Sequence, residues 1–204
     1  MRMEKQRGIR ILSIVALFVA VIGLSVAFAA MSRTLQINGT ATMDTATWDI
    51  HFENLSNAAL TGDAAVTTAP ELKNENTVIG DFEVVLIKPG DSVTYTFDIV
   101  NNGTIDAKLS ELVMAGLADK KLVCTSLADP KSTADETTVC GNLTYTLEYT
   151  DGGAVAAGDK LAAKSGDTAT RKNVTLTLKY DGDTLPEDDV EITGLDITMV
   201  YNQD

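Results

Sequence analysis

Few side chains of this sequence are suited to acid–base, nucleophilic or metal chemistry. The chain has a single histidine, His51, and two cysteines, Cys124 and Cys140. A zinc site needs several nitrogen, sulfur or carboxylate ligands around one ion, and no H-E-x-x-H pattern contains His51. The G-x-S-x-G elbow, the P-loop and the G-x-G-x-x-G loop are also absent from the sequence. We therefore expect no enzyme activity, no catalytic residue, no metal, no cofactor and no small-molecule substrate.

The residues around His51 indicate a β-strand. In "TWDIHF", Trp48, Ile50 and Phe52 alternate with polar residues, as on the apolar face of a half-buried strand. His51 then points to the opposite face, and we expect it to be exposed to solvent. Two acidic turns, "YTDGG" and "YDGDTLPEDD", offer oxygen ligands that calcium accepts, but neither has the EF-hand spacing. We interpret both as solvated turns.

The two cysteines flank a polar, turn-rich segment, "TSLADPKSTADETTV". If the chain is exported, Cys124 and Cys140 lie in a compartment where a disulfide persists. Closing a loop of about 15 residues stabilises a fold by roughly 3 kcal/mol in the chain-entropy model. We predict this disulfide, with two unrelated reduced thiols as the alternative.

Residues 1–30 have the composition of an export signal or a membrane-anchor helix. Residues 1–10 are net basic, and residues 11–31 contain no charged side chain. As a helix, such a segment reaches about 31 Å, enough to span the hydrocarbon layer. The small-x-small sequence Ala27-Phe28-Ala29 is typical of a signal-peptidase site. We expect cleavage after the site formed by Ala27 and Ala29, or an uncleaved anchor in contact with the membrane through residues 11–31. A type IV-like pilin is a third alternative, but Ser13 stands where such pilins have glutamate.

Several segments of residues 31–204 show the two-residue period of β-strands. Apolar and β-branched residues alternate with polar ones in "DSVTYTFDIV", "NLTYTLEY", "NVTLTLKY" and "LDITMVY". Turn signals such as "KPGD" and "NNGT" separate the runs. We predict one all-β domain over residues 31–204, an antiparallel β-sandwich of the jelly-roll or immunoglobulin-like kind. Residues 54–80 and 125–139 are expected to be loop-like insertions, the first a long excursion or a β-hairpin, and residues 103–118 are the best candidate for a short helix.

The charge of the chain excludes one class of partner. The formal net charge is −13, although residues 1–10 are basic. Nucleic-acid binding draws most of its affinity from a basic surface. We therefore expect no nucleic-acid partner.

Two segments resemble a known protein family. Residues 86–109, "LIKPGDSVTYTFDIVNNGTIDAKL", and residues 37–52, "INGTATMDTATWDIHF", are similar to segments of the TasA/camelysin family of exported bacterial matrix-fibre proteins. The resemblance implies a jelly-roll-like sandwich, removal of a signal by a dedicated peptidase, and assembly into extracellular fibres. It also implies that the N-terminal strand of one subunit can complete the sheet of the next. Camelysin-like proteins have been described as metallopeptidases, for which His51 would be the only histidine ligand.

The segment after the predicted cleavage site has the pattern of a donor strand. Cleavage near Ala30 leaves "MSRTLQINGTA" as a free alternating strand with Thr34, Leu35, Ile37 and Thr40. Strand addition gains main-chain hydrogen bonds and side-chain pockets, and a head-to-tail contact that does not close propagates into a filament. The alternative is that this strand pairs within its own domain.

We thus predict a secreted subunit of an extracellular surface or biofilm-matrix filament, a homopolymer assembled by N-terminal strand donation. The leading alternative is a membrane-anchored, non-polymerising binding or adhesion module at the cell surface. A type IV-like pilin and a camelysin-type metallopeptidase are minor alternatives.

Overall fold

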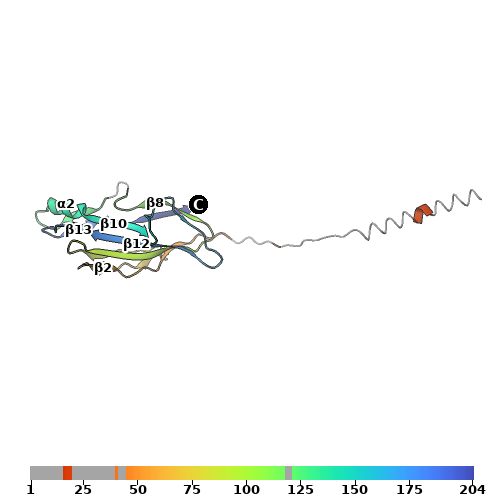
Figure 1. Ribbon diagram of the computed structural model, residues 1–204, viewed down its shortest axis with the longest axis horizontal. Coiled ribbons are helices and arrows are strands. Elements are labelled where there is room, and N and C mark those ends of the chain that lie inside the picture. Colours follow the sequence, from red (N-terminus) through yellow and green to blue (C-terminus); the bar gives the residue numbers. More distant parts are fainter. Residues whose placement is uncertain (1–15, 20–39, 41–44, 118–120) are drawn as a thin grey trace, which may run out of the picture. The chain divides into compact units, whose positions relative to one another are not determined.

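The computed structural model describes residues 16–19, 40, 45–117 and 121–204 (Figure 1). The chain divides into two compact units, Met1–Asp44 and Thr45–Asp204, which are described separately. In the first unit, residues 16–19 are helical and exposed. Within the described ranges, no helix combines the length and the apolar character that crossing a bilayer requires.

Nearly all helices and strands of the second unit are strands, which confirms the prediction of an all-β chain. Its elements are β1 (Ile50–Glu53), β2 (Ala59–Thr61), β3 (Ala65–Thr68), β4 (Leu72–Lys73), β5 (Val78–Ile79), β6 (Glu83–Val85), β7 (Ser92–Asn101), β8 (Ala107–Val113), β9 (Val123–Ser126), α2 (Thr133–Gly141), β10 (Leu143–Tyr149), β11 (Lys160–Leu161), β12 (Thr170–Tyr180), β13 (Val190–Thr193) and β14 (Thr198–Gln203).

The strands form two larger sheets and three pairs, all antiparallel. The five-stranded sheet has the order β1-β7-β12-β10, with β2 also paired to β7. The three-stranded sheet has the order β11-β8-β14, and the pairs are β13-β9, β3-β6 and β4-β5. Consequently β1 is an edge strand of the first sheet and β14 is an edge strand of the second.

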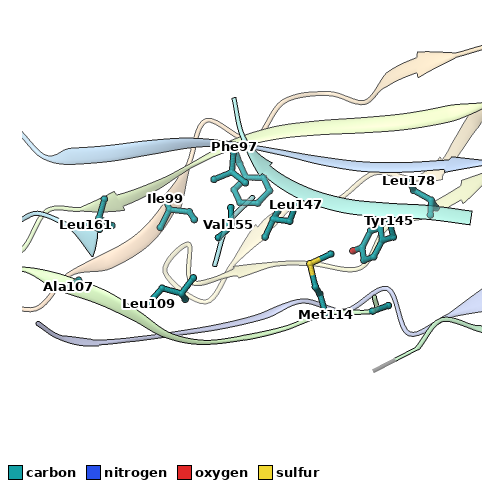
Figure 2. Close-up of a cluster of buried hydrophobic side chains, with 12 residues drawn as sticks. Phe97, Ile99, Ala107, Leu109, Met114, Tyr145, Leu147, Val155, Leu161 and Leu178 are labelled. Carbon is teal, nitrogen blue, oxygen red and sulfur yellow. The ribbon is translucent and has the colours of Figure 1, made fainter. Parts of the chain in front are cut away.

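Both larger sheets bury apolar side chains in one core (Figure 2). Alternation explains which side chains enter it, because residues two apart on a strand share a face. Phe97 and Ile99 of β7 contribute from the five-stranded sheet, and Leu109 of β8 and Leu161 of β11 contribute from the three-stranded sheet. The main core therefore holds the two sheets together.

Polar side chains fix both ends of β7. Before the strand, the buried carboxylate of Asp91 accepts hydrogen bonds from three main-chain N–H groups, those of Asp63, Ile87 and Lys88. At its end, the buried Asn101 side chain accepts from the Gly103 N–H at 2.9 Å and donates to the carbonyls of Ile105 and Leu161 at 2.9 and 3.2 Å. These bonds tie the end of β7 to the turn that precedes β8 and to β11.

The turn after β7 also explains a glycine. A Cβ atom on Gly103 would lie 2.5 Å from the Thr47 carbonyl oxygen and 2.9 Å from the Asp49 nitrogen. Both approaches are shorter than a carbon atom tolerates, so glycine allows the chain entering β1 to lie directly against this turn.

Three segments differ from the sequence predictions. Residues 103–118 were the best candidate for a short helix, but this interpretation was wrong, because strand β8 lies in this segment. Ala107 and Leu109, two residues apart, both enter the core, as residues on one face of a strand do. The segment 125–139 contains the end of β9 and most of α2 rather than a loop; the Ser132 hydroxyl caps the helix by accepting from the Asp135 N–H. Residues 54–80 contain β2, β3, β4 and β5, and the β4–β5 hairpin is the kind of insertion that the sequence left open.

Candidate functional site

A groove of about 200 Å³ lies where the edge strands β1 and β14 approach each other. Apolar and aromatic side chains form most of its walls, and Trp48 stands at its side with 45% of its surface exposed. The residues that line the groove are Trp48, Ile50, His51, Phe52, Thr77, Ile99, Met199 and Tyr201. A half-exposed tryptophan beside a groove with both apolar and polar groups is typical of a binding surface.

The strand pattern of β1 places its apolar side chains against this groove and the core. Ile50 and Phe52 pack on the core cluster, and the Phe52 ring meets the Phe97 ring edge-on with centroids 5.4 Å apart. The predicted apolar face of "TWDIHF" is thus correct for Ile50 and Phe52. Trp48 precedes β1 and keeps much of its ring in solvent.

The main chain of β1 has hydrogen-bonding groups that face away from the sheet. The Asn102 N–H donates to the Asp49 carbonyl at 2.9 Å. The main-chain N–H and C=O groups of residue 49, and of every second residue after it on β1, therefore face β7. In an antiparallel pair the intervening residues point outward, and Phe52 follows this rule, since its N–H donates to the Asn76 carbonyl at 2.8 Å. By the same alternation, the N–H and C=O of Ile50 face the open side of β1.

The edge strand β14 also has main-chain hydrogen-bonding groups that face away from its sheet. The Asp204 N–H donates to the Asp106 carbonyl of the segment before β8 at 3.0 Å. Alternation from this bond places the main-chain groups of Tyr201 and Gln203 on the side away from β8. Two strand edges with outward main-chain groups therefore border one groove.

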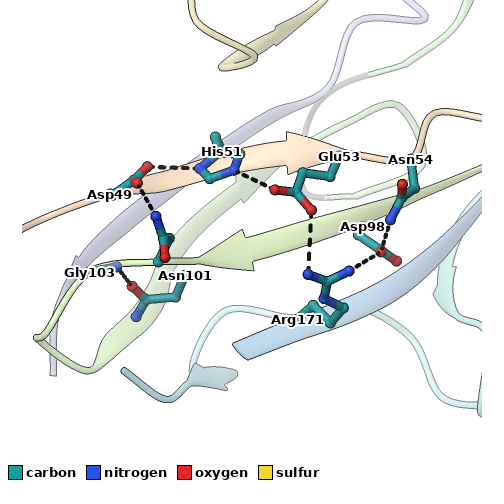
Figure 3. A network of polar contacts seen from close by, with 9 residues as sticks. Asp49, His51, Glu53, Asn54, Asp98, Asn101, Gly103 and Arg171 are labelled. Carbon is teal, nitrogen blue, oxygen red and sulfur yellow. Dashed lines mark hydrogen bonds and ion pairs between the residues drawn. The ribbon is translucent and has the colours of Figure 1, made fainter. Parts of the chain in front are cut away.

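The side chain of His51 lies on the face of β1 away from Ile50 and Phe52, where it joins a network of charged groups (Figure 3). Its Nδ1 lies 2.7 Å from Asp49 Oδ1 and its Nε2 lies 3.0 Å from Glu53 Oε1. Arg171 of β12 continues the network, with its guanidinium nitrogens 3.5 Å from Glu53 and 3.7 Å from Asp98. These contacts connect β1, β7 and β12 on one face of the five-stranded sheet.

The two carboxylates favour the protonated form of His51. Burial by itself lowers the pKa of His51, but the hydrogen bonds to Glu53 and Asp49 outweigh it and raise the pKa above its ordinary value. Burial raises the pKa of Asp49, yet its bonds to His51 and Asn102 outweigh this and lower it. An imidazolium that donates from both nitrogens has no lone pair for a metal. Across the described ranges, no cluster of three or more His, Cys, Asp or Glu side chains has an arrangement that could hold a metal ion.

The prediction that the His51 side chain is exposed to solvent was wrong. The side chain does lie on the face away from Ile50 and Phe52, but only 15% of it is exposed. The signal for its partners was in the sequence: Asp49 and Glu53 stand two residues before and after His51, and such residues share a strand face.

The predicted cysteine pair is bonded in the structure. Cys124 and Cys140 form a disulfide with Cα atoms 5.8 Å apart, joining β9 to α2. Helix α2, which carries Cys140, lies at the end of the second unit away from the C-terminus (Figure 1). The disulfide is therefore remote from the C-terminal end of β14.

Most of the predicted N-terminal site residues lie outside the described part of the chain. This applies to Ala27 and Ala29 of the cleavage site and to Thr34, Leu35 and Ile37 of the donor strand. Thr40 is described and is exposed, outside any helix or strand. The groove has no signal in the sequence, because it depends on strand order.

No protein-family model, curated protein or solved structure matches this chain.

Proposed function

We propose that this protein is a secreted structural subunit of an extracellular filament. Its two larger sheets form the layers of an antiparallel β-sandwich of the jelly-roll or immunoglobulin-like kind. The groove between β1 and β14 accepts the N-terminal strand, residues 32–43, of a neighbouring copy. The observation that carries this proposal is the presence of two edges with outward main-chain groups beside one groove whose lining includes Trp48, Ile50 and Phe52.

The donor segment has the chemistry that this groove accepts. Leu35 and Ile37 are two residues apart and therefore share one strand face. A cavity of about 150 Å³ lined by apolar side chains is known to hold an apolar molecule the size of benzene, so a groove of about 200 Å³ has room for an aliphatic side chain. Covering the exposed part of Trp48, about 100 Å², stabilises the contact by about 2 to 3 kcal/mol.

Strand donation of this kind produces a filament rather than a closed dimer. The donor segment and the acceptor groove are different surfaces of one chain, so each copy can accept one strand and donate another. The resemblance of residues 37–52 and 86–109 to the TasA/camelysin family supports the same assembly. The disulfide between Cys124 and Cys140 supports an oxidising location outside the cytosol.

Deleting residues 32–41 tests the proposal. The expected product is a folded monomer, judged by circular dichroism, that forms no filaments in negative-stain electron microscopy. Substituting both Leu35 and Ile37 by Asp should have the same effect. The matched control substitutes Gln36 and Asn38, the alternate face of the strand, by Asp and should retain filaments. Filaments of normal appearance after the deletion would contradict strand donation.

The uncharged residues 11–31 favour a second candidate, a membrane-anchored binding or adhesion module that does not polymerise. N-terminal sequencing of the protein at the cell surface distinguishes the two. A start near Ala30 or Met31 supports the secreted filament subunit. An intact N-terminal segment, together with monomeric protein at the surface, supports the anchored module.

A further inference from the structure

The hairpin of β4 and β5 has a turn in an unfavourable backbone conformation. Its strands contain two residues each, and the turn residues Asn74, Glu75 and Asn76 have φ angles of 53°, 56° and 63°. Asparagine tolerates this left-handed region, whereas other L-residues reach it only at an energetic disadvantage. Glu75 is the turn residue least suited to its conformation, and its side chain is exposed.

This turn occupies the outer edge of β1. The Asn76 carbonyl accepts the outward N–H of Phe52 at 2.8 Å, and Thr77 lines the groove beside it. A carbonyl of a neighbouring strand would take the same position in an extended sheet. The hairpin thus satisfies an edge that is otherwise open to pairing with another chain.

We propose that the incoming strand of the neighbouring copy pairs with β1, and that the turn of the β4–β5 hairpin guards this edge until the strand displaces Asn76 from Phe52. This inference rests on the proposed function, since it specifies the acceptor edge and its control. The strain at Glu75 and the shortness of β4 and β5 make the guard easy to open.

The edge of β1 suits the incoming strand better than the edge of β14. The register of β14 on β8 shifts between Val200 and Tyr201, where Ser110 is an extra residue on β8. Such a bulge increases the local twist and turns the adjoining edge away from a new strand. On β1, residues 50 and 52 keep a regular register with β7. The bond from Phe52 to Asn76 also shows that a carbonyl fits against this side of β1.

Amide hydrogen exchange of the full, processed chain tests which edge accepts the strand. In the monomer, the Phe52 amide should be protected by Asn76, and the Ile50 amide should exchange rapidly. In the filament, the Ile50 amide should slow by about 100-fold or more, as expected for a newly buried main-chain bond, while Tyr201 and Gln203 stay unchanged. If amide exchange in the filament becomes slower at Tyr201 and Gln203 but not at Ile50, the assignment to β1 is overturned while strand donation is not affected. Failure to form any filament would overturn both.

Two substitutions at Glu75 test the guard. Glu75→Gly favours the left-handed conformation, so it should slow Phe52 exchange in the monomer and slow filament elongation, each about fivefold. Glu75→Val disfavours that conformation and should accelerate both by a similar factor. Light scattering gives the elongation rate. If Phe52 exchange follows these directions while the elongation rate is the same in both variants and the wild type, the hairpin does not control assembly. Unchanged Phe52 exchange would show that the turn does not hold this edge.

Discussion

At the scale of single residues, His51 links the stability of β1 to pH. Both of its ring nitrogens face carboxylates, and its pKa is raised above its ordinary value. A raised pKa in the folded state stabilises the fold fully below the unfolded pKa of about 6.5, and this contribution is lost as pH rises through the folded value. The edge beside the groove is therefore held most firmly under mildly acidic conditions.

Replacing His51 by Gln should remove this pH dependence. We expect the difference in unfolding free energy between wild type and His51→Gln to be largest near pH 6 and to shrink toward pH 9, as deprotonation removes the charge from the wild-type ring. Denaturant unfolding at several pH values measures the difference. A difference that stays constant over this range would contradict the role assigned to the imidazolium.

The buried Asn101 gives a second test at this scale. Its side chain makes three hydrogen bonds that tie the end of β7 to the turn before β8 and to β11. Asn101→Ala leaves buried main-chain groups without partners and should destabilise the fold by about 3 kcal/mol. The neighbouring Asn102 is exposed and donates to the half-buried Asp49, so Asn102→Ala should change stability by less than about 0.5 kcal/mol. Equal effects of the two substitutions would contradict the role given to Asn101.

At the scale of elements, α2 depends on its attachments. The helix contains nine residues, with Asp135 and Val139 as its buried side chains. A Ser132 cap, acidic residues in the first turn and the disulfide from Cys140 to β9 hold it in place. Such a helix shows no apolar period in its sequence, which is why residues 125–139 looked like a loop.

Removing the disulfide tests this dependence. The two cysteines are 16 positions apart, and losing a cross-link over a loop of that length should destabilise the fold by about 3 kcal/mol. Replacing Cys124 and Cys140 together by Ser should produce this loss in denaturant unfolding. Because the groove lies away from the disulfide, the pH response that depends on His51 should persist. An unchanged unfolding free energy would show that the cross-link does not stabilise the fold.

The alternation of apolar and polar residues predicted the long strands correctly, but it did not predict strands whose composition also suits a helix. Strands β7, β10 and β12 have four apolar residues at a spacing of two, and each is present in the structure. The segment "AKLSELV" of β8 also suits a helix by composition, and only its pairing with β11 and β14 makes it a strand. The turn at Asn74–Asn76 and its contact with Phe52 depend on tertiary structure and have no periodic signal.

At the scale of the whole molecule, the groove arises from strand order. β1 and β14 come from opposite ends of the second unit in sequence, and each is an edge because of how β7 and β8 pair. Periodicity identifies strands but not their neighbours, so the sequence predicted a donor strand without locating its acceptor. The structure shows the groove, and its role as an acceptor for residues 32–43 stays a proposal.

The most direct test of strand donation is a cryo-electron microscopy map of the assembled filament at side-chain resolution. We expect residues 32–43 of a neighbouring copy to lie as a strand along β1, with the side chains of Leu35 and Ile37 in the groove against Trp48 and Tyr201. A map in which the groove is empty, or is filled by residues 32–43 of the same chain, would contradict the proposal.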